Sequence, residues 1–352
     1  MNILKYICLP GLLVSGDIQT VSAVESKTDK NPNILVILID DAGYNDFGFM
    51  GSKEMQTPNI DALTSEGVVF TDAHVAATVS SPSRACLITG RYGHRFGYEC
   101  NLSDRTNGLP LEEETIAEVF KTNGYRTAAI GKWHLGSRDE QHPNNRGFDL
   151  FYGMKAGGRD YFYNEKKSDR PGDERNLLLN DRQVKFEKYL TDAFSEKAVE
   201  FINESSQPFM MYLAYNAVHT PMQATDEDMA KFEGHPRQKL AAMTYALDRG
   251  VGTVIRGLKD SGKFDNTLIF FLSDNGGATT NQSSNYPLKG FKGNKFEGGH
   301  RVPYFVVWKN GIPAGKPYDG LVSSLDIFAT AIDAPVYRKH VIDWTVYHYY
   351  LT

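Results

Sequence analysis

An uninterrupted apolar run near the start of the sequence limits the possible folds more than any other feature. Residues 33–39 read NILVILI, in which every residue after the asparagine is apolar and most are β-branched. A strand with one face in water alternates apolar and polar residues, whereas a strand buried on both faces of a parallel sheet is apolar throughout. This segment therefore predicts a central strand of a parallel sheet.

Three later segments repeat the order of a helix followed by an apolar strand, and they cover residues 111–136, 194–221 and 237–277. A shorter helix is expected after Thr57, which is placed as its N-cap, with Pro58 in the first turn. Helices that alternate with apolar strands favour a wound sheet. The predicted fold class is α/β, with a mostly parallel central sheet and helices on both faces.

Composition narrows the class of protein. The chain has 352 residues, of which 41% are hydrophobic and 23% charged, and these values are typical of a soluble globular protein. The formal net charge is -5 at pH 7, so a general affinity for nucleic acid is not expected. Beyond the N-terminus, no stretch is apolar for long enough to suggest a membrane span.

The N-terminus resembles an export signal over residues 1–23. Lys5 precedes an apolar stretch at 7–14 that is too short to span a bilayer, and Ala23 lies close to a suitable cleavage point. Asp17 argues against this interpretation, and a disordered leader is the alternative. An export signal would place the protein in the periplasm or at the cell surface of a Gram-negative bacterium.

Polar residues follow the predicted strands where each strand ends. Because the carboxyl ends of parallel strands share one edge of the sheet, residues far apart in sequence are expected to meet there. The residues concerned are Asp40, Asp41, Lys132, His134, His219, Asp274 and Asn275. Carboxylates gathered together repel one another unless a cation lies among them, and ligation by oxygen alone suits Ca²⁺ or Mg²⁺ rather than zinc. The alternative for each acidic pair is an ordinary cap of a helix or turn.

A serine-rich segment, VSSPSRACLITG at 79–90, is expected to begin a helix. Pro82 suits the first helical position, which makes Ser81 the N-cap and leaves Ser80 just outside the helix. The free N–H groups and the positive dipole end of a helix N-terminus attract an anionic group. Arg84 would lie in the first turn and point back towards Ser80 as a fixed cation, or else lie on the surface of an ordinary capped helix.

The same segment resembles the signature of the type I, formylglycine-dependent sulfatases, which have Cys or Ser, any residue, Pro-Ser-Arg and, after a short gap, Leu-x-Thr-Gly. Ser80 occupies the position of the residue that this family modifies. Other segments resemble the family in the same order: ILIDDAGYNDFG at 37–48, GKWHLG at 131–136, AVHTP at 217–221, SDNGG at 273–277 and KGNKFEGGHRVP at 292–303. Because the resemblance extends from about Asn33 to Asp333, the chain is identified as a member of this arylsulfatase-like family of the alkaline phosphatase superfamily, with a catalytic domain at 33–334.

The resemblance implies a modified nucleophile and a metal site. A separate maturation enzyme would oxidise Ser80 to formylglycine, an aldehyde that hydrates to a geminal diol. The serine form resembles bacterial enzymes matured by a radical iron–sulfur enzyme, and an engineered change from cysteine to serine is the alternative origin. The implied ligands of a divalent ion, Ca²⁺ in preference to Mg²⁺, are Asp40, Asp41, Asp274 and Asn275. The residues implied to line the sulfate pocket are Arg84, Lys132, His134, His219 and Lys292.

The implied residues have distinct chemical roles. One hydroxyl of the diol attacks sulfur, and the second then loses its proton and expels sulfate, with His134 as its partner. His219 protonates the leaving alcohol, while Lys132 and Lys292 face the negative charge on the sulfate oxygens. Taken alone, either histidine would be interpreted as hydrogen-bonded structure, and Lys292 as solvated charge in a lysine-rich loop.

The C-terminus departs from the family pattern. Members are usually longer and carry a smaller C-terminal subdomain beside the main sheet, but residues 335–352 do not resemble the sequence expected there. A truncation or frame shift near Pro335 is expected, with the C-terminal subdomain largely missing and apolar surface exposed where it would pack.

The expected reaction is hydrolysis of sulfate esters on a sulfated carbohydrate, such as a mucin or glycosaminoglycan fragment. Two other functions remain open. Phosphodiester or phosphonate hydrolases of the same superfamily bind zinc through nitrogen ligands, and they typically read Ser-Asp-His where this chain has Ser273, Asp274 and Asn275. A truncated and inactive homologue would only bind sulfated glycans.

Overall fold

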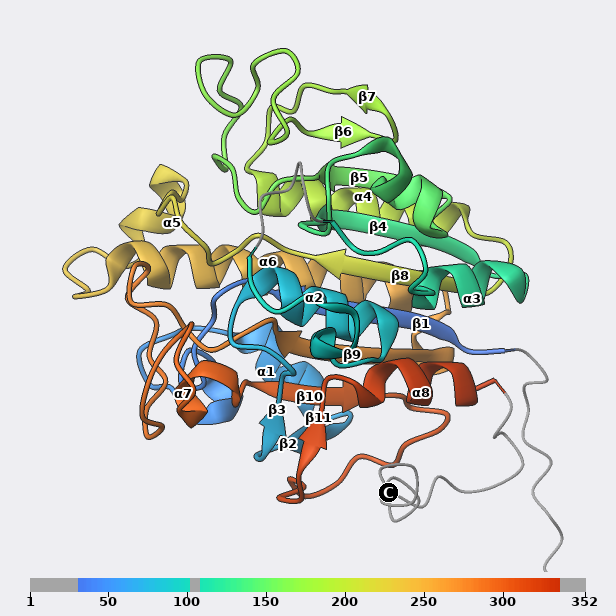
Figure 1. The fold of residues 1–352 in the computed structure, drawn as a ribbon. Coiled ribbons are helices and arrows are strands. Elements are labelled where there is room, and N and C mark those ends of the chain that lie inside the picture. The colour runs from blue at the N-terminus through green and yellow to red at the C-terminus, as the bar shows by residue number, and fades with distance from the viewer. Residues whose placement is uncertain (1–30, 102–107, 336–352) are drawn as a thin grey trace, which may run out of the picture. The chain divides into compact units, whose positions relative to one another are not determined.

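The computed structural model describes residues 31–101 and 108–335. The predicted export signal lies outside the described residues, as does the predicted C-terminal tail beyond Pro335. The described residues build one large sheet with helices packed on both of its faces (Figure 1). None of the helices in this part of the chain is both long and apolar enough to cross a lipid bilayer.

The central sheet has nine strands in the order β2-β10-β9-β1-β8-β4-β5-β6-β7. Strands β9, β1, β8, β4 and β5 are parallel to one another, whereas β10, β2, β6 and β7 pair antiparallel at the two edges. The strands are β1 (Asn33–Ile39), β2 (Val68–Phe70), β4 (Arg126–Lys132), β5 (Leu150–Met154), β6 (Leu178–Leu179), β7 (Arg182–Gln183), β8 (Phe209–Ala214), β9 (Thr267–Ser273) and β10 (Tyr304–Val307). Two short strands, β3 (Ala73–His74) and β11 (Val322–Ser323), form a separate parallel pair. The predicted α/β fold with a mostly parallel central sheet is confirmed.

The packing of β1 explains why its sequence is apolar throughout. Leu35, Ile37 and Ile39 enter a core shared with α1, α4 and α6, and the residues between them enter a second core shared with α2, α3 and α8 (Figure 1). All of these β1 side chains are fully buried. The helices are α1 (Pro58–Thr64), α2 (Ser80–Thr89), α3 (Ile116–Thr122), α4 (Leu190–Glu204), α5 (Asp226–Ala230), α6 (Gln238–Asp260), α7 (Glu297–His300) and α8 (Asp326–Asp333). Helices therefore cover both faces, as predicted.

The start of α1 differs from the prediction in its capping group. Thr57 occupies the N-cap position, but its hydroxyl donates to Asp61 instead of accepting a bond from the first turn. The first-turn N–H groups of Asn59 and Ile60 donate to the carboxylate of Asp248, which lies on α6. The cap of α1 thus comes from another helix.

The start of α2 also differs from the prediction. The helix begins at Ser80, and its N-cap is Val79, which has an extended backbone, so the prediction of Ser81 as the N-cap is wrong. Pro82 is the third helical residue, where its missing N–H has no partner to lose within the helix. The hydroxyl of Ser81 donates instead to the carbonyl of His134, at 2.7 Å. Ser80 therefore lies inside the first turn.

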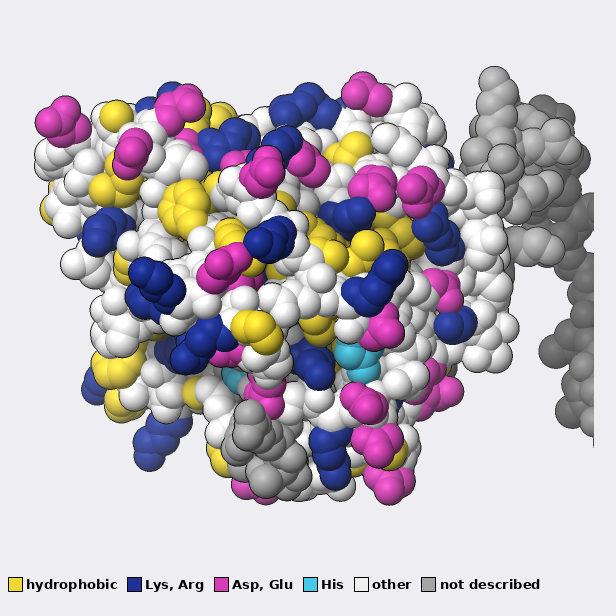
Figure 2. All heavy atoms as spheres, turned by 90° about the horizontal axis from the view of Figure 1, so that it is seen from above, with side chains coloured by type: hydrophobic (Ala, Val, Ile, Leu, Met, Phe, Trp, Pro, Cys, Tyr) yellow, Lys and Arg dark blue, Asp and Glu magenta, His cyan; other side chains and the backbone are white. Residues whose placement is uncertain are grey.

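Charged side chains of both signs cover the face seen from above in Figure 2, which lies over β6 and β7. Lys and Arg side chains are interspersed there with Asp and Glu, and apolar side chains lie among them, several of them next to one another near the middle of the view. Among the described residues of this face, neither sign of charge predominates.

Candidate active site

The polar residues predicted to meet lie together at the carboxyl ends of the parallel strands. β1 pairs with β9 so that Ile39 lies opposite Ser273, and the residues that follow each strand therefore leave the sheet side by side. These residues are Asp40, Asp41, Asp274 and Asn275, and all four are buried. The backbone N–H of Asp41 donates to Oδ1 of Asp274 at 3.3 Å, which ties the two acidic segments together.

Ser80 is placed in this cluster by the N-terminus of α2. Its Oγ lies 3.1 Å from Oδ1 of Asp40 and 3.1 Å from Oδ1 of Asn275, and the side chain is buried. A hydroxyl has a single hydrogen, so it can donate to only one of these two acceptor oxygens at a time. Oxygen atoms of three side chains thus converge on one point.

Arg84 is buried and holds Asp274, so the alternative of a surface arginine is excluded. Its Nε and Nη2 donate to Oδ2 of Asp274, at 3.1 and 2.8 Å, and Nη1 donates to the carbonyl of Lys132 at 3.1 Å. Nη2 also lies 3.7 Å from Oδ1 of Asp40. The guanidinium is therefore shared by two carboxylates, and Oδ1 of Asp40, which it faces, is the same oxygen that Oγ of Ser80 contacts.

Two lysines neutralise the other carboxylates. Nζ of Lys132, the last residue of β4, donates to Oδ2 of Asp40 at 2.6 Å, and Nζ of Lys292 donates to Oδ1 of Asp41 at 2.6 Å. Burial alone would raise the pKa of Asp40, but the charges of Lys132, His219 and Arg84 outweigh it and hold that pKa well below its usual range. Burial also disfavours the charged form of Lys292, yet Asp40 and Asp41 raise its pKa.

His219 is the most accessible of the predicted catalytic groups that contact this cluster, with 24% of its side chain exposed. Its Nδ1 lies 2.6 Å from the carbonyl oxygen of Thr220, which can only accept, so Nδ1 carries a hydrogen. Nε2 faces the site, 3.7 Å from Oδ2 of Asp41. The ring is thus oriented so that Nε2 can exchange a proton with a bound molecule.

His134 is half-buried, and its desolvation, together with the charges of Lys132 and Arg84, lowers its pKa well below the ordinary value. A neutral imidazole at neutral pH can accept a proton. Gly157 and Gly158 pack closely against the two histidine rings. A Cβ added to Gly157 would lie 2.6 Å from Nε2 of His134, and one added to Gly158 would lie 3.3 Å from the ring of His219. Sequence reasoning missed both glycines, although the pair stands out in KAGGRD.

Two site residues have a left-handed backbone, Asp41 with φ of 64° and His134 with φ of 59°. This conformation is costly for residues other than glycine and persists where neighbours hold it. Nδ2 of Asn281 donates to the carbonyls of Asp41 and Val218, at 3.1 and 2.9 Å, and Oγ of Ser283 donates to the same carbonyl of Asp41 at 2.9 Å. Sequence reasoning also missed Asn281 and Ser283, because nothing in their polar loop marks them.

The oxygen atoms of the site suit a hard divalent cation. Three carboxylates, one amide oxygen and Oγ of Ser80 converge, and oxygen ligands of this kind bind Ca²⁺ or Mg²⁺. A carboxylate oxygen of Asp40, one of Asp41 and a ring nitrogen of His219 all lie within 4.8 Å of one another. His219, which was not among the predicted metal ligands, therefore borders the place where a cation would lie.

Comparisons with known proteins agree with this geometry. A family model described as Sulfatase matches residues 32–334. The uncharacterised sulfatase YdeN of Escherichia coli strain K12 is 34% identical over 88% of this chain and 63% of its own length. Arylsulfatase G of Mus musculus is 36% identical over 86% of this chain and 64% of its own length. The chain thus spans less than two thirds of the length of these two relatives.

A solved structure is similar along most of the chain. The crystal structure of Ps i-CgsB in complex with k-i-k-neocarrahexaose has a TM-score of 0.83 and 43% sequence identity, and the match covers 88% of this chain and 73% of that one. The match of the family model covers far more than half of the residues, including every predicted site residue. The chain belongs to the sulfatase family.

Proposed function

We propose that this protein hydrolyses sulfate esters of a sulfated carbohydrate. The nucleophile is the side chain at position 80 after oxidation to formylglycine, and Asp40, Asp41, Asp274 and Asn275 hold a Ca²⁺ ion beside it. The observation that carries the proposal is the position of Oγ of Ser80, 3.1 Å from oxygens of both Asp40 and Asn275. The similarity to Ps i-CgsB, which was crystallised with an oligosaccharide, supports a carbohydrate substrate.

The fixed charges of the site favour an anionic product. Three carboxylates face three cationic side chains, those of Arg84, Lys132 and Lys292, so their charges cancel. A bound divalent cation would leave two positive charges, which equal the two negative charges of a released sulfate ion. When bound, such a cation lowers the pKa of an adjacent hydroxyl and so provides a stronger nucleophile.

Oxidation at position 80 lets the sulfated intermediate break down quickly. A sulfate ester formed on an ordinary serine hydrolyses slowly, whereas the hydrate of formylglycine has a second hydroxyl whose loss of a proton lets sulfate leave. In this scheme Nε2 of His219 protonates the oxygen of the leaving alcohol as the S–O bond breaks. His134, which is neutral, accepts the proton from the second hydroxyl at position 80. The cations Lys132 and Lys292 stabilise negative charge on the sulfate oxygens.

The residue after Asp274 favours sulfate over phosphate esters. Asn275 offers an oxygen at the position where the zinc-dependent relatives typically have a nitrogen ligand. Its Nδ2 donates to Oδ1 of Asp41 at 2.9 Å. The ligand set at this position therefore suits a hard cation better than zinc.

The test measures sulfate release by the full chain, produced together with a radical iron–sulfur maturation enzyme. Sulfated saccharides are compared with phosphodiesters and phosphonate esters. Ser80→Ala should reduce sulfate release by at least about a thousandfold. The control Ser65→Ala, at an exposed position just after α1, should not change it. Faster turnover of phosphodiesters by a zinc-containing protein, or glycan binding without turnover, would contradict the proposal.

A further inference from the structure

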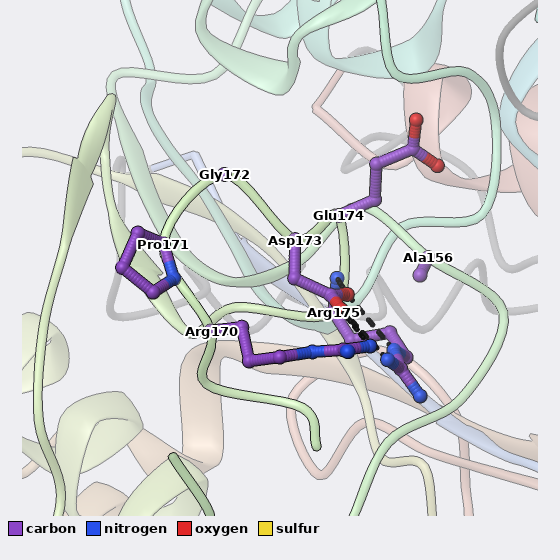
Figure 3. A pocket seen from close by; sticks show the side chains of 7 residues that line it. All are labelled: Ala156, Arg170, Pro171, Gly172, Asp173, Glu174 and Arg175. Atoms are coloured by element: carbon purple, nitrogen blue, oxygen red, sulfur yellow. Dashed lines mark hydrogen bonds and ion pairs between the residues drawn. The ribbon is translucent and has the colours of Figure 1, made fainter. Parts of the chain in front are cut away.

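A separate cavity of about 530 Å³ lies between Ala156 and the loop of residues 170–175. Its lining residues, shown in Figure 3, are Ala156, Arg170, Pro171, Gly172, Asp173, Glu174 and Arg175. Ala156 directly precedes Gly157 and Gly158, which pack against His134 and His219. The backbone N–H of Ala156 donates to the carbonyl of Glu174 at 3.1 Å, so one wall of the cavity continues into the wall of the active site.

The loop that forms this cavity is held from beneath by a buried ion pair. Nη2 of Arg159 donates to both carboxylate oxygens of Asp169, at 2.7 and 2.8 Å, and Nη1 donates to the carbonyl of Arg175 at 3.0 Å. Nδ2 of Asn176 donates to the carbonyl of Arg170 at 2.8 Å. The backbones of both cavity arginines are thus fixed by side chains that are themselves buried.

The carboxylate of Asp173 contacts both arginines of the cavity. Nε and Nη2 of Arg175 donate to the two oxygens of Asp173, at 2.8 and 2.6 Å, and Nη2 of Arg170 lies 3.5 Å from the same carboxylate. Figure 3 shows both guanidinium groups close to Asp173, with the carboxylate of Glu174 turned away from them. These bonds use only some of the N–H donors that two guanidinium groups offer. The lining has two cationic and two anionic side chains, so an anion would bind through the remaining N–H donors and not through an excess of positive charge.

The accessible arginine is Arg170, with 58% of its side chain exposed, compared with 36% for Arg175. The mixed charges on the face shown in Figure 2 give a polyanion no extended surface of one sign to bind. Affinity for an anionic chain would then need a specific cluster. A planar guanidinium fits the oxygens of a sulfate or a carboxylate with paired hydrogen bonds.

We propose that this cavity is a subsite for a second anionic group, a sulfate or a carboxylate, on a sugar adjacent to the one that loses sulfate. The inference rests on the proposed function, in which His219 protonates the leaving alcohol and His134 accepts the proton of the second hydroxyl at position 80. Arg170 is the principal contact, and Asp173 and Arg175 orient it. The protein then prefers a saccharide with two anionic groups over one with a single sulfate.

The test compares Arg170→Gln with the wild-type full chain on three substrates. These are a monosulfated monosaccharide, a disulfated disaccharide, and a disaccharide with one sulfate and one uronic acid. Loss of one charged hydrogen-bonding group is expected to raise KM for a doubly charged substrate about tenfold, with kcat and the monosaccharide unaffected. A rise confined to the disulfated or to the uronic acid substrate identifies the second group as sulfate or carboxylate.

The matched control is Arg182→Gln, an exposed arginine on β7 outside the cavity. The proposal is overturned if the two variants behave alike on both disaccharides, or if Arg170→Gln impairs turnover of the monosaccharide to the same degree. A second measurement, calorimetry, compares binding of the same saccharides by Ser80→Ala and by the double variant Ser80→Ala with Arg170→Gln, and it needs no turnover. Absence of all sulfate release by the wild type would contradict the proposed function. Equal binding of the disaccharides by the two variants would contradict the subsite.

Discussion

Around Ser80, buried acidic side chains are neutralised by buried cationic side chains. Asp40 is fully buried, and its closest cation is Lys132, which is also buried. A buried ion pair adds little to stability over an apolar pair, but removal of one partner leaves the other as an uncompensated buried charge. The residues that bind substrate in the proposed mechanism therefore also maintain the fold of the site.

Lys132→Met tests this coupling. The change removes the charge but keeps the side-chain length, so Asp40 loses its 2.6 Å partner. We expect the free energy of unfolding to fall by about 3 kcal/mol, together with a loss of sulfate release. Urea denaturation measures the first effect.

The control for this prediction is Lys121→Met. Lys121 pairs with Asp149 at 2.8 Å on the surface, where both side chains are more than a third exposed. An exposed pair of this kind contributes at most about 1 kcal/mol. Equal destabilisation by the two variants would show that the Lys132–Asp40 pair has no special role.

His134 gives the protein a predictable dependence of stability on pH. Burial, Lys132 and Arg84 lower its pKa in the folded state, so the unfolded chain binds more protons at this residue below about pH 6.5. Its contribution to stability is therefore complete above that pH and is lost as the pH falls, by up to about 1.4 kcal/mol per pH unit. His134→Gln should lose less stability than the wild type between pH 7 and pH 5.

The measurement is urea denaturation at both pH values, with His94→Gln as the control because His94 is exposed. The control should retain the pH dependence of the wild type. If His134→Gln and the wild type lose equal stability on acidification, His134 is not held in its neutral form by the fold.

At the scale of helices and strands, the sequence predicts the features that depend on residues near one another in the chain. The order of helices and strands followed from apolar runs and periodicity, because burial on both faces of the sheet imposes those patterns. The cap of α1 could not be predicted in this way, since Asp248 is 189 residues away from Asn59 in sequence. Ser81 failed as an N-cap because its hydroxyl binds the carbonyl of His134, another contact made only in the folded chain.

Asp248→Ala tests the cap that α6 provides to α1. The carboxylate accepts from the backbone of Ile60 at 2.8 Å and from the side chain of Asn59 at 2.7 Å. Because the change leaves buried donors without a partner, we expect the free energy of unfolding to fall by about 3 kcal/mol. Asp260→Ala, at the exposed end of the same helix, should change it by less than about 0.5 kcal/mol. If both variants are equally stable, α1 does not depend on this cap.

The predicted site residues came from motifs, and the structure places Ser80, Arg84 and the acidic residues in one cluster. Residues that support this cluster escaped prediction because their roles depend on where the chain returns in space. Asn281 binds the carbonyls of Asp41 and Val218, which lie on different loops, and Gly157 matters only through its contact with His134. Such contacts leave no periodic signal in the sequence.

In the molecule as a whole, a cation at the carboxyl edge of the sheet would link segments that follow β1 and β9. Ligands that bind only the folded state stabilise it by mass action, by about 2.7 kcal/mol at one hundred times the dissociation constant. Calcium added to chelator-treated protein should therefore raise Tm. Asp41→Asn should weaken this rise, while Asp265→Asn, at an exposed residue paired with Lys309, should not. A larger rise with zinc than with calcium would contradict the proposed metal.

The most direct test of the account is the mass of the tryptic peptide of residues 54–84, taken from a preparation that releases sulfate from a saccharide. Oxidation of Ser80 to formylglycine predicts a peptide lighter than the encoded sequence by two hydrogen atoms, with the difference located at position 80. An active preparation in which every copy of this peptide has the mass of unmodified serine would contradict the account.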